Sequence, residues 1–267
     1  MAFDLKAYFA RIRFDGSAAA DLKTLRQLHL LHACAIPFEN LDALLGRKIY
    51  LDDEGIFSKL VSAGRGGYCF EQNGLFRRAL QEIGYETEDL AARVVLMRPP
   101  QMPARTHRLQ LVTLGQERWL TDVGFGGKTL TAPLRFAPDV EQATPHGLYK
   151  ITRADADFLL SKREADEWLP MYRFDLQRQY FSDYEAANHY VATWPESHFR
   201  HHLAVCLHMT DGSSVTLGDN QLTLDGEKQM LADSASIYQA LHAHLGIRLD
   251  DPVHGIDFES FNRTFRC

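Results

Sequence analysis

The sequence predicts an α+β fold in which helices come first and a strand-rich region follows. Up to Gly84 the apolar residues recur three and four positions apart, which is the period of a helix with one buried face. After Gly84 the pattern changes to short apolar runs separated by turn residues, as in β-strands. Past Arg200, three or four short strands precede a last helix.

Four helices are expected in the first part of the chain, and together they predict a helical bundle at residues 1–84. Asp52 or Asp53 is placed to cap the third helix, and Gly64 and Gly84 are placed to end the third and fourth. The expected ranges are about 5–12, 22–36, 53–63 and 69–83.

The middle of the chain, residues 85–200, is predicted to form a sheet that closes or curls into a barrel. Its strand candidates are 89–97, 107–114, 118–123, 148–152, 158–160 and 171–176, and the aromatic run Asn188–Phe199 is expected to be irregular. Residues 201–267 form the third part. Its strand candidates are 203–209, 214–217 and 221–224, with a last helix capped by Asp233 or Ser234.

Composition and charge exclude several kinds of partner. The net charge is −6 and no block of lysine and arginine stands out, so nucleic acid is not expected. No apolar span is long enough to cross a membrane, and the N-terminus lacks a signal sequence. The four cysteines are scattered without a CxxC pair, which argues against structural zinc and disulfides. These features predict a cytoplasmic protein with reduced thiols and no metal.

Cys69 stands where two helical patterns meet, in the stretch Arg65–Asn73. Gly64, Gly66 and Gly67 break the first pattern and allow the backbone to come close to a ligand. We therefore expect Cys69 at or near a helix N-terminus, where free N–H groups and the helix dipole favour the thiolate, the reactive form of cysteine. The alternative is a buried cysteine that serves as a small apolar side chain.

His107 and Asp122 come together if the residues between them form a hairpin. A two-residue turn at Gly115–Gln116 places Gly124 opposite His107. Asp122 is then the diagonal neighbour of His107 on the same face, where its carboxylate can accept the second N–H of the imidazole. A register slip of one residue would turn Asp122 to the other face, so a strand-end carboxylate in solvent remains the alternative.

The residues next to these candidates are less specific. The glycines at 124–127 can bring backbone N–H groups to a phosphate, but a plain turn fits the same pattern. Three bulky apolar residues fit a core better than a pocket on residue type alone: Phe38, Val95 and Phe125. Three polar residues near Cys69 are expected to brace its turn: Arg65, Glu71 and Asn73.

Five stretches resemble motifs of the arylamine N-acetyltransferases. They are Ile36–Leu41, Arg65–Asn73, Thr106–Arg108, Trp119–Gly126 and Asn188–Phe199. The second has the pattern Arg-Gly-Gly-Tyr-Cys-Phe-Glu-x-Asn, which resembles the family's nucleophile motif. The matches extend from about residue 8 to 200 in the family's order. At 192–195 the chain has Ala-Thr-Trp-Pro where the family carries a Ser-Thr pair, so the acceptor preference is not carried over.

The resemblance implies a catalytic triad of Cys69, His107 and Asp122. It also implies an N-terminal helical bundle, a central β-barrel and a C-terminal α/β lid, around a core like that of cysteine proteases and transglutaminases. The implied reaction is ping-pong acetyl transfer from acetyl-CoA, through a Cys69 thioester, to aromatic amines, hydrazines and N-hydroxyarylamines, by a monomer or homodimer. The implied coenzyme contacts are Thr106, Gly126 and Gly127, and the implied acceptor pocket is Phe38, Val95 and Phe125.

Three other functions compete with this one. A cysteine hydrolase or transglutaminase-like amidase uses the same Cys–His–Asp order but needs no coenzyme. An amide synthase with the same fold would close a macrocycle on a carrier-bound acyl chain. A ligand-binding module with an inert Cys69 would show the alkylation rate of a free model thiol.

Overall fold

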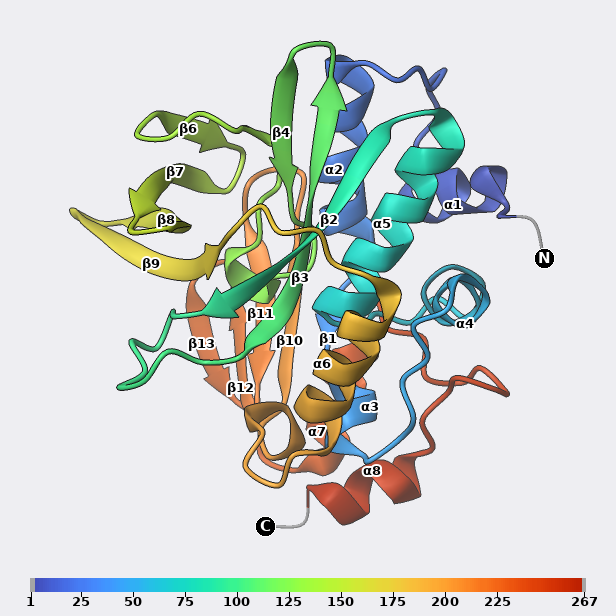
Figure 1. Cartoon of the computed structure of the whole chain (residues 1–267). Helices are drawn as coiled ribbons and strands as arrows, with labels where there is room; N and C mark the ends of the chain where they lie inside the picture. Colours follow the sequence, from blue (N-terminus) through green and yellow to red (C-terminus); the bar gives the residue numbers. More distant parts are fainter. Residues whose placement is uncertain (1–2, 266–267) are drawn as a thin grey trace.

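The N-terminal part of the protein is helical, as predicted. The structure is a computed structural model that describes residues 3–265 (Figure 1). Asp52 accepts the N–H of Gly55 at 2.9 Å and so caps α4, which a π-helical turn at Ser58–Ser62 continues. Gly84 ends α5 in the left-handed conformation, with φ of 105°. The helices are α1 (Leu5–Ile12), α2 (Leu22–Ala35), α3 (Leu41–Leu44), α4 (Asp53–Phe57) and α5 (Cys69–Ile83).

An antiparallel sheet of eight strands forms a nearly closed barrel, in order β5-β4-β3-β2-β9-β8-β7-β6. The edge strands β5 and β6 are joined by the side chain of Gln142, whose amide oxygen accepts the N–H of Arg135 at 2.8 Å and whose nitrogen donates to its carbonyl at 2.9 Å. The strands are β2 (Glu86–Val94), β3 (Arg105–Leu114), β4 (Glu117–Thr121), β5 (Leu134–Arg135), β6 (Glu141–Thr144), β7 (Gly147–Ala154), β8 (Asp157–Glu164) and β9 (Glu167–Phe174). The predicted barrel is confirmed, although the sequence indicated neither β5 nor β6.

A second sheet joins the N-terminal and C-terminal parts of the chain. Phe38 pairs with Cys206, so β1 adds an N-terminal strand to a C-terminal sheet of order β1-β10-β11-β12-β13. The division of the chain at residues 84 and 200 stays a prediction. The elements are β1 (Phe38–Glu39), β10 (Ala204–His208), β11 (Ser214–Gly218), β12 (Gln221–Leu224), β13 (Glu227–Met230), α7 (Ser234–Ala243) and α8 (Phe258–Thr264).

The prediction that Asn188–Phe199 is irregular is wrong for its first half. That half belongs to α6 (Phe181–Thr193), and a short 3₁₀ turn follows at His198–Arg200. The helix was missed because its buried face, formed by Tyr184, Asn188 and Val191, includes a polar residue that interrupts the apolar period.

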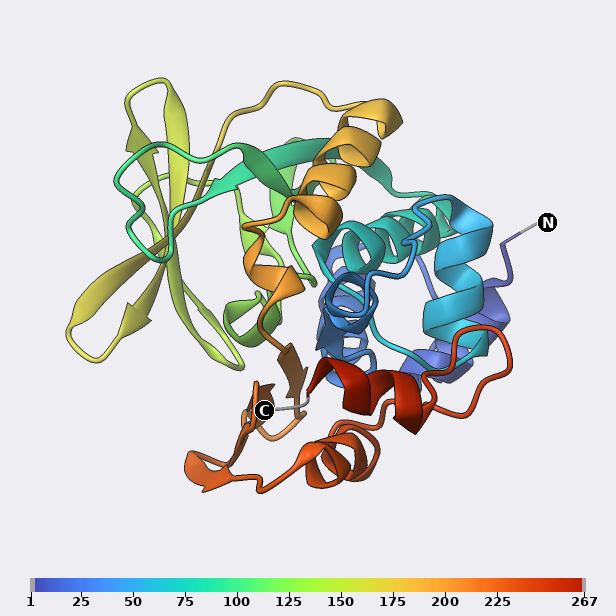
Figure 2. The same ribbon diagram turned by 90° about the horizontal axis from the view of Figure 1, so that it is seen from below.

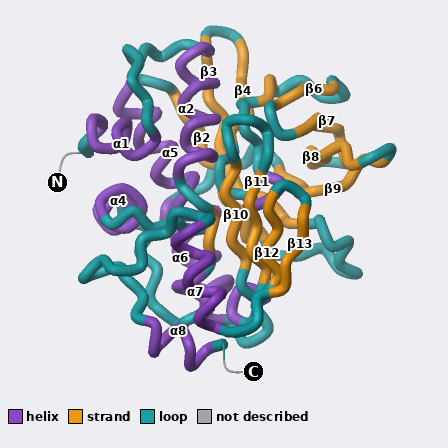
Figure 3. The backbone as a smooth tube through the Cα atoms, turned by 180° about the vertical axis from the view of Figure 1, so that it is seen from behind, coloured by secondary structure: helices purple, strands orange, loops and turns teal. Residues whose placement is uncertain are grey.

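The hairpin of β3 and β4 packs against the helices rather than only within the barrel. Val112, Trp119 and Val123 belong to the same apolar core as α1, α2, α4 and α5. Seen from below, the barrel strands and the N-terminal helices lie on opposite sides, with α6 between them (Figure 2). From behind, β10–β13 lie next to the barrel, with α7 beside them (Figure 3). No helix within residues 3–265 is long and apolar enough to cross a membrane.

Candidate active site

Cys69 is the first residue of α5, at the end of a tight turn. The carboxylate of Glu71 accepts the N–H of Tyr68 at 3.1 Å, which satisfies a backbone donor at the start of the helix. Gly66 is required in this turn, because a Cβ atom there would lie 2.2 Å from the carbonyl oxygen of Pro37. The Cys69 sulfur lies 3.7 Å from the carbonyl oxygen of Thr106, so the turn delivers the thiol to the start of β3.

The β3–β4 hairpin has the register that its two-residue turn predicts, with Leu114 opposite Glu117. It places Asp122 Oδ2 2.7 Å from His107 Nε2, which leaves Nδ1 as the ring nitrogen for Cys69. Burial alone would lower the pKa of His107. The charge and hydrogen bond of Asp122, together with contact to Cys69, outweigh burial and raise the pKa of His107 to about 10.

The Asp122 carboxylate is fully buried and has three hydrogen-bond partners. Oδ1 accepts from the Asn73 side-chain nitrogen at 2.9 Å and from the Gly124 N–H at 3.0 Å, while Oδ2 faces His107. Burial would raise the pKa of Asp122, but the charge of His107 and these hydrogen bonds lower it below its ordinary value. The residue therefore holds a negative charge beside His107.

Asn73 and Gly124 hold the hairpin against α5. Asn73 donates to the carbonyl of Arg108 at 2.7 Å and accepts the N–H of Val123 at 3.0 Å, so one amide joins α5 to both strands. A Cβ atom at Gly124 would lie 2.8 Å from Cys69 Cα. Only glycine permits this approach, which brings the chain segment after Asp122 next to Cys69.

Five buried ionic side chains support the turn that carries Cys69: Glu39, Asp42, Lys59, Arg65 and Glu71. Arg65 pairs with Glu39 at 2.6 Å, and the Lys59 ammonium lies 2.6 Å from Asp42 and 2.7 Å from Glu71. Burial raises the pKa of Glu71 to about 7, although Lys59 opposes that shift. Arg65 and Glu71 thus brace the turn, as the sequence indicated, whereas the Asn73 side chain forms its hydrogen bonds with the β3–β4 hairpin and the residues after it.

Aromatic side chains surround His107. Phe125 packs edge-on to the imidazole with a centroid separation of 5.0 Å, and Tyr172 of β9 lies at 5.0 Å. Phe38 belongs to the apolar cluster that contains Cys69. Val95 donates its N–H to the carbonyl of Met171, next to Tyr172. The sequence did not single out Tyr172, because it reaches His107 only through strand pairing within the barrel.

The candidate coenzyme residues lie close to these side chains. Thr106 offers its carbonyl to Cys69, and Gly126 and Gly127 open a 3₁₀ turn at Gly126–Lys128. A Cβ atom at Gly126, whose φ is 72°, would lie 3.4 Å from the ring of Phe38. The structure thus brings the glycine stretch and the predicted acceptor wall side by side.

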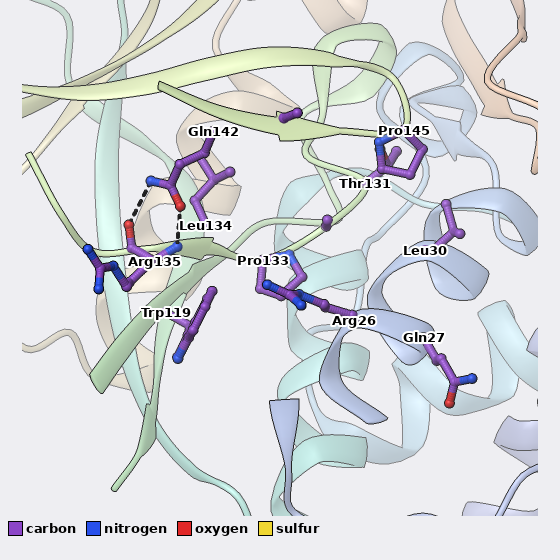
Figure 4. A pocket seen from close by; sticks show the side chains of 12 residues that line it. Arg26, Gln27, Leu30, Trp119, Thr131, Pro133, Leu134, Arg135, Gln142 and Pro145 are labelled. Carbon is purple, nitrogen blue, oxygen red and sulfur yellow. Dashed lines mark hydrogen bonds between the residues drawn. The ribbon is translucent and has the colours of Figure 1, made fainter. Parts of the chain in front are cut away.

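Two cavities lie away from Cys69, His107 and Asp122. The first has a volume of about 580 Å³ and separates α2 from the strands β4–β6 (Figure 4). The second, of about 330 Å³, lies between residues 47–52 and α6. None of the three candidate catalytic residues lines either cavity. The side chains labelled in Figure 4 are Arg26, Gln27, Leu30, Trp119, Thr131, Pro133, Leu134, Arg135, Gln142 and Pro145.

Comparison with known proteins places the chain among acetyltransferases. A sequence model described as N-acetyltransferase matches residues 21–253. The arylamine N-acetyltransferase of Escherichia coli K12 is 50% identical over 256 residues, which cover 94% of this chain and 91% of that protein. The structure of the Salmonella typhimurium arylamine N-acetyltransferase aligns with a TM-score of 0.95 and 44% identity, over 98% of this chain and 97% of the other. The structure of the Mycobacterium marinum enzyme in complex with CoA aligns with a TM-score of 0.92 and 35% identity, over 98% of both chains.

Acetyltransferases are the class that the matching sequence model and the aligned structures define, and those structures share the cysteine-protease-like fold predicted for this chain. Within that class, the chain belongs to the arylamine N-acetyltransferase family, since half of its residues are identical to those of one member over nearly its whole length. The predicted family and fold are confirmed.

Proposed function

We propose that this protein transfers the acetyl group of acetyl-CoA to aromatic amines, hydrazines and N-hydroxyarylamines by a ping-pong mechanism. The observation that carries the proposal is the placement of Cys69 at the start of α5, beside an imidazole whose other nitrogen lies 2.7 Å from the buried carboxylate of Asp122. A nucleophile, a base and an orienting carboxylate are the parts that acyl transfer through a covalent intermediate requires.

In the first half-reaction the Cys69 thiolate attacks the thioester carbonyl while His107 is protonated. The bond between the acetyl carbon and the coenzyme sulfur breaks, and a bond to Cys69 Sγ forms. The departing sulfur takes the proton from His107. Because one thioester replaces another, the exchange is nearly isoenergetic and the acetyl-enzyme can accumulate.

In the second half-reaction the amine attacks the acetyl carbon of the Cys69 thioester. His107, now neutral, accepts a proton from the amine nitrogen, and the Cys69 sulfur leaves as a thiolate paired with the imidazolium. Asp122 stabilises that positive charge. Because the amine must outcompete water for the acetyl group, the reaction favours a partly dry pocket with aromatic walls.

For the two substrates we propose separate contacts around Cys69. Phe38 and Phe125, together with Val95, would line the acceptor pocket, while Thr106, Gly126 and Gly127 would contact the coenzyme. The proximity of Gly126 to Phe38 supports a shared cleft. The solved M. marinum relative in complex with CoA supports acetyl-CoA as the co-substrate.

The test is the mass of the intact protein after mixing with acetyl-CoA in the absence of amine. We expect a stable gain of one acetyl group that an aromatic amine or hydrazine discharges. Cys69→Ala should show no gain, whereas Cys34→Ala, which changes a half-buried thiol elsewhere, should behave like the wild type. No adduct on a protein whose Cys69 is still rapidly alkylated would contradict the proposal and favour the hydrolase function.

A further inference from the structure

His29 is a fully buried side chain of α2 that contacts the backbone of Asp122. Its Nε2 lies 3.3 Å from the Asp122 nitrogen, which carries a proton and can only donate. Nε2 is therefore the acceptor, and the ring proton of the neutral imidazole lies on Nδ1. Within residues 3–265 Nδ1 has no hydrogen-bond partner, and the ring packs edge-on to Phe76 with centroids 5.4 Å apart.

The position of Asp122 in the chain explains why this acceptor matters. Asp122 follows directly after β4 ends at Thr121, so no ladder partner is available for its N–H. A buried N–H without a partner is costly. His29 satisfies this donor, while the Thr129 hydroxyl donates to the Asp122 carbonyl at 2.9 Å. The backbone on both sides of the Asp122 side chain is thereby fixed.

His29 also remains uncharged beside the carboxylate. Burial lowers the pKa of His29 to about 3, although Asp122 raises it and His32 lowers it further. A protonated His29 would be a second cation next to Asp122 and would compete with His107 for its charge. A neutral acceptor avoids that competition.

We propose that His29 is a positioning residue for acetyl transfer. It holds the Asp122 backbone so that the carboxylate meets His107 Nε2, and as a neutral ring it leaves the full charge of that carboxylate to His107. The proposal rests on the Cys69–His107–Asp122 triad of the proposed function.

The experiment compares His29→Leu with His29→Gln in single-turnover acetylation by acetyl-CoA, followed by intact mass between about pH 6.5 and pH 9.5. Leucine fills the site without an acceptor, whereas the glutamine oxygen can stand near the position of Nε2. We expect His29→Leu to acetylate about 10- to 100-fold more slowly at neutral pH, as for a buried donor left unpaired. His29→Gln should retain the wild-type rate within about threefold.

The pH profile separates positioning from a loss of stability. If the Asp122 carboxylate loosens, the pKa of His107 falls from about 10 toward its ordinary value, and the imidazolium is lost at alkaline pH. The His29→Leu rate should then drop at least about tenfold between about pH 7 and pH 9, while the wild-type rate stays level. Leu28→Ala is the control, because it removes an equally buried side chain from the same helix. It should lower the Tm and keep the level profile.

Two results would overturn the role of His29. One is a His29→Leu variant that acetylates at the wild-type rate. The other is a slower variant whose pH profile stays level, as in Leu28→Ala, which would make His29 a purely structural residue. Absence of any acetyl-enzyme in the wild type would instead contradict the triad itself, so the two failures are distinguishable.

Discussion

The side chains that hold Cys69 in place and those that hold Asp122 in place differ in chemistry. The turn before Cys69 is held by ionisable side chains, with Arg65 and Lys59 paired to Glu39, Asp42 and Glu71. The Asp122 carboxylate instead has neutral partners apart from His107, namely the Asn73 amide and the Gly124 N–H. Both regions are buried, so the difference does not come from access to water.

This difference follows from what each region does in the proposed reaction. The ionic side chains around the Cys69 turn pair with one another, and this pairing holds the backbone that carries the thiol. Beside Asp122 an additional cation would weaken the carboxylate's effect on His107. Neutral donors orient the same carboxylate and leave its charge for the imidazolium.

The largest expected effect comes from removing the negative charge of Asp122. Asp122→Asn should slow acetylation by about 10⁴-fold, because the amide can hold the imidazole in the wrong tautomer. The measurement is the single-turnover rate of acetyl-enzyme formation. Asp219→Asn is the matched control, since Asp219 lies 3.0 Å from His202 in an exposed pair. A loss under about tenfold in Asp122→Asn would mean that Asp122 does not orient His107.

The next largest effect is a loss of stability on removing one cation from the ionic network at the Cys69 turn. Arg65→Met should lower the free energy of unfolding by about 3 to 5 kcal/mol, because it leaves Glu39 and Asp42 buried with one fewer cation. Denaturant titration measures this change. Arg263→Met removes one partner of an exposed pair with Glu259 and should change stability by less than about 1 kcal/mol. Equal effects of the two substitutions would show that the buried network does not stabilise the fold.

Glu71 makes the stability of the ionic network depend on pH. Its pKa is raised to about 7 by burial, so the folded state holds this proton where the unfolded chain has released it. The resulting stability is fully present below the ordinary pKa of 4.5 and is lost as the pH rises through about 7. Glu71→Gln should remove this loss, worth roughly 3 kcal/mol.

The measurement for Glu71 is the unfolding free energy of both proteins between about pH 5 and pH 8. Relative to the wild type, Glu71→Gln should become more stable as the pH rises. Glu82→Gln, which alters the pair of the exposed Glu82 with the half-buried Arg78, should run parallel to the wild type. A pH-independent difference for Glu71→Gln would place the proton elsewhere in the network.

The smallest expected effect comes from changing Phe125, which lies near both Cys69 and Asp122. Phe125 packs on His107, but its side chain belongs neither to the ionic network at the Cys69 turn nor to the hydrogen bonds of Asp122. Phe125→Ala should shift the ratio of kcat/KM between two aromatic amines by about tenfold while changing acetyl-CoA hydrolysis less. Steady-state assays of both reactions provide the comparison. Equal effects on the two would place Phe125 outside the acceptor pocket.

Features encoded by neighbouring residues were accessible from the sequence alone. The apolar period and Gly84 predicted α5 with Cys69 at its start, and Gly115–Gln116 predicted the hairpin register that joins His107 to Asp122. Helix periods, caps and two-residue turns each depend on a few consecutive residues, which is why these predictions succeeded. α6 was missed in part because Asn188 interrupts its buried face.

Only the tertiary structure decided how distant segments support the site. Four contacts join segments whose own sequences carry no signal of the pairing. They are the hydrogen bond of Gln142 between β5 and β6, the pairing of β1 with β10, the packing of Tyr172 on His107 and the contact of His29 with Asp122. The partner of each buried ring then set its chemistry. His29 is a neutral acceptor whereas the pKa of His107 is raised, because the first ring faces a backbone N–H and the second faces a carboxylate.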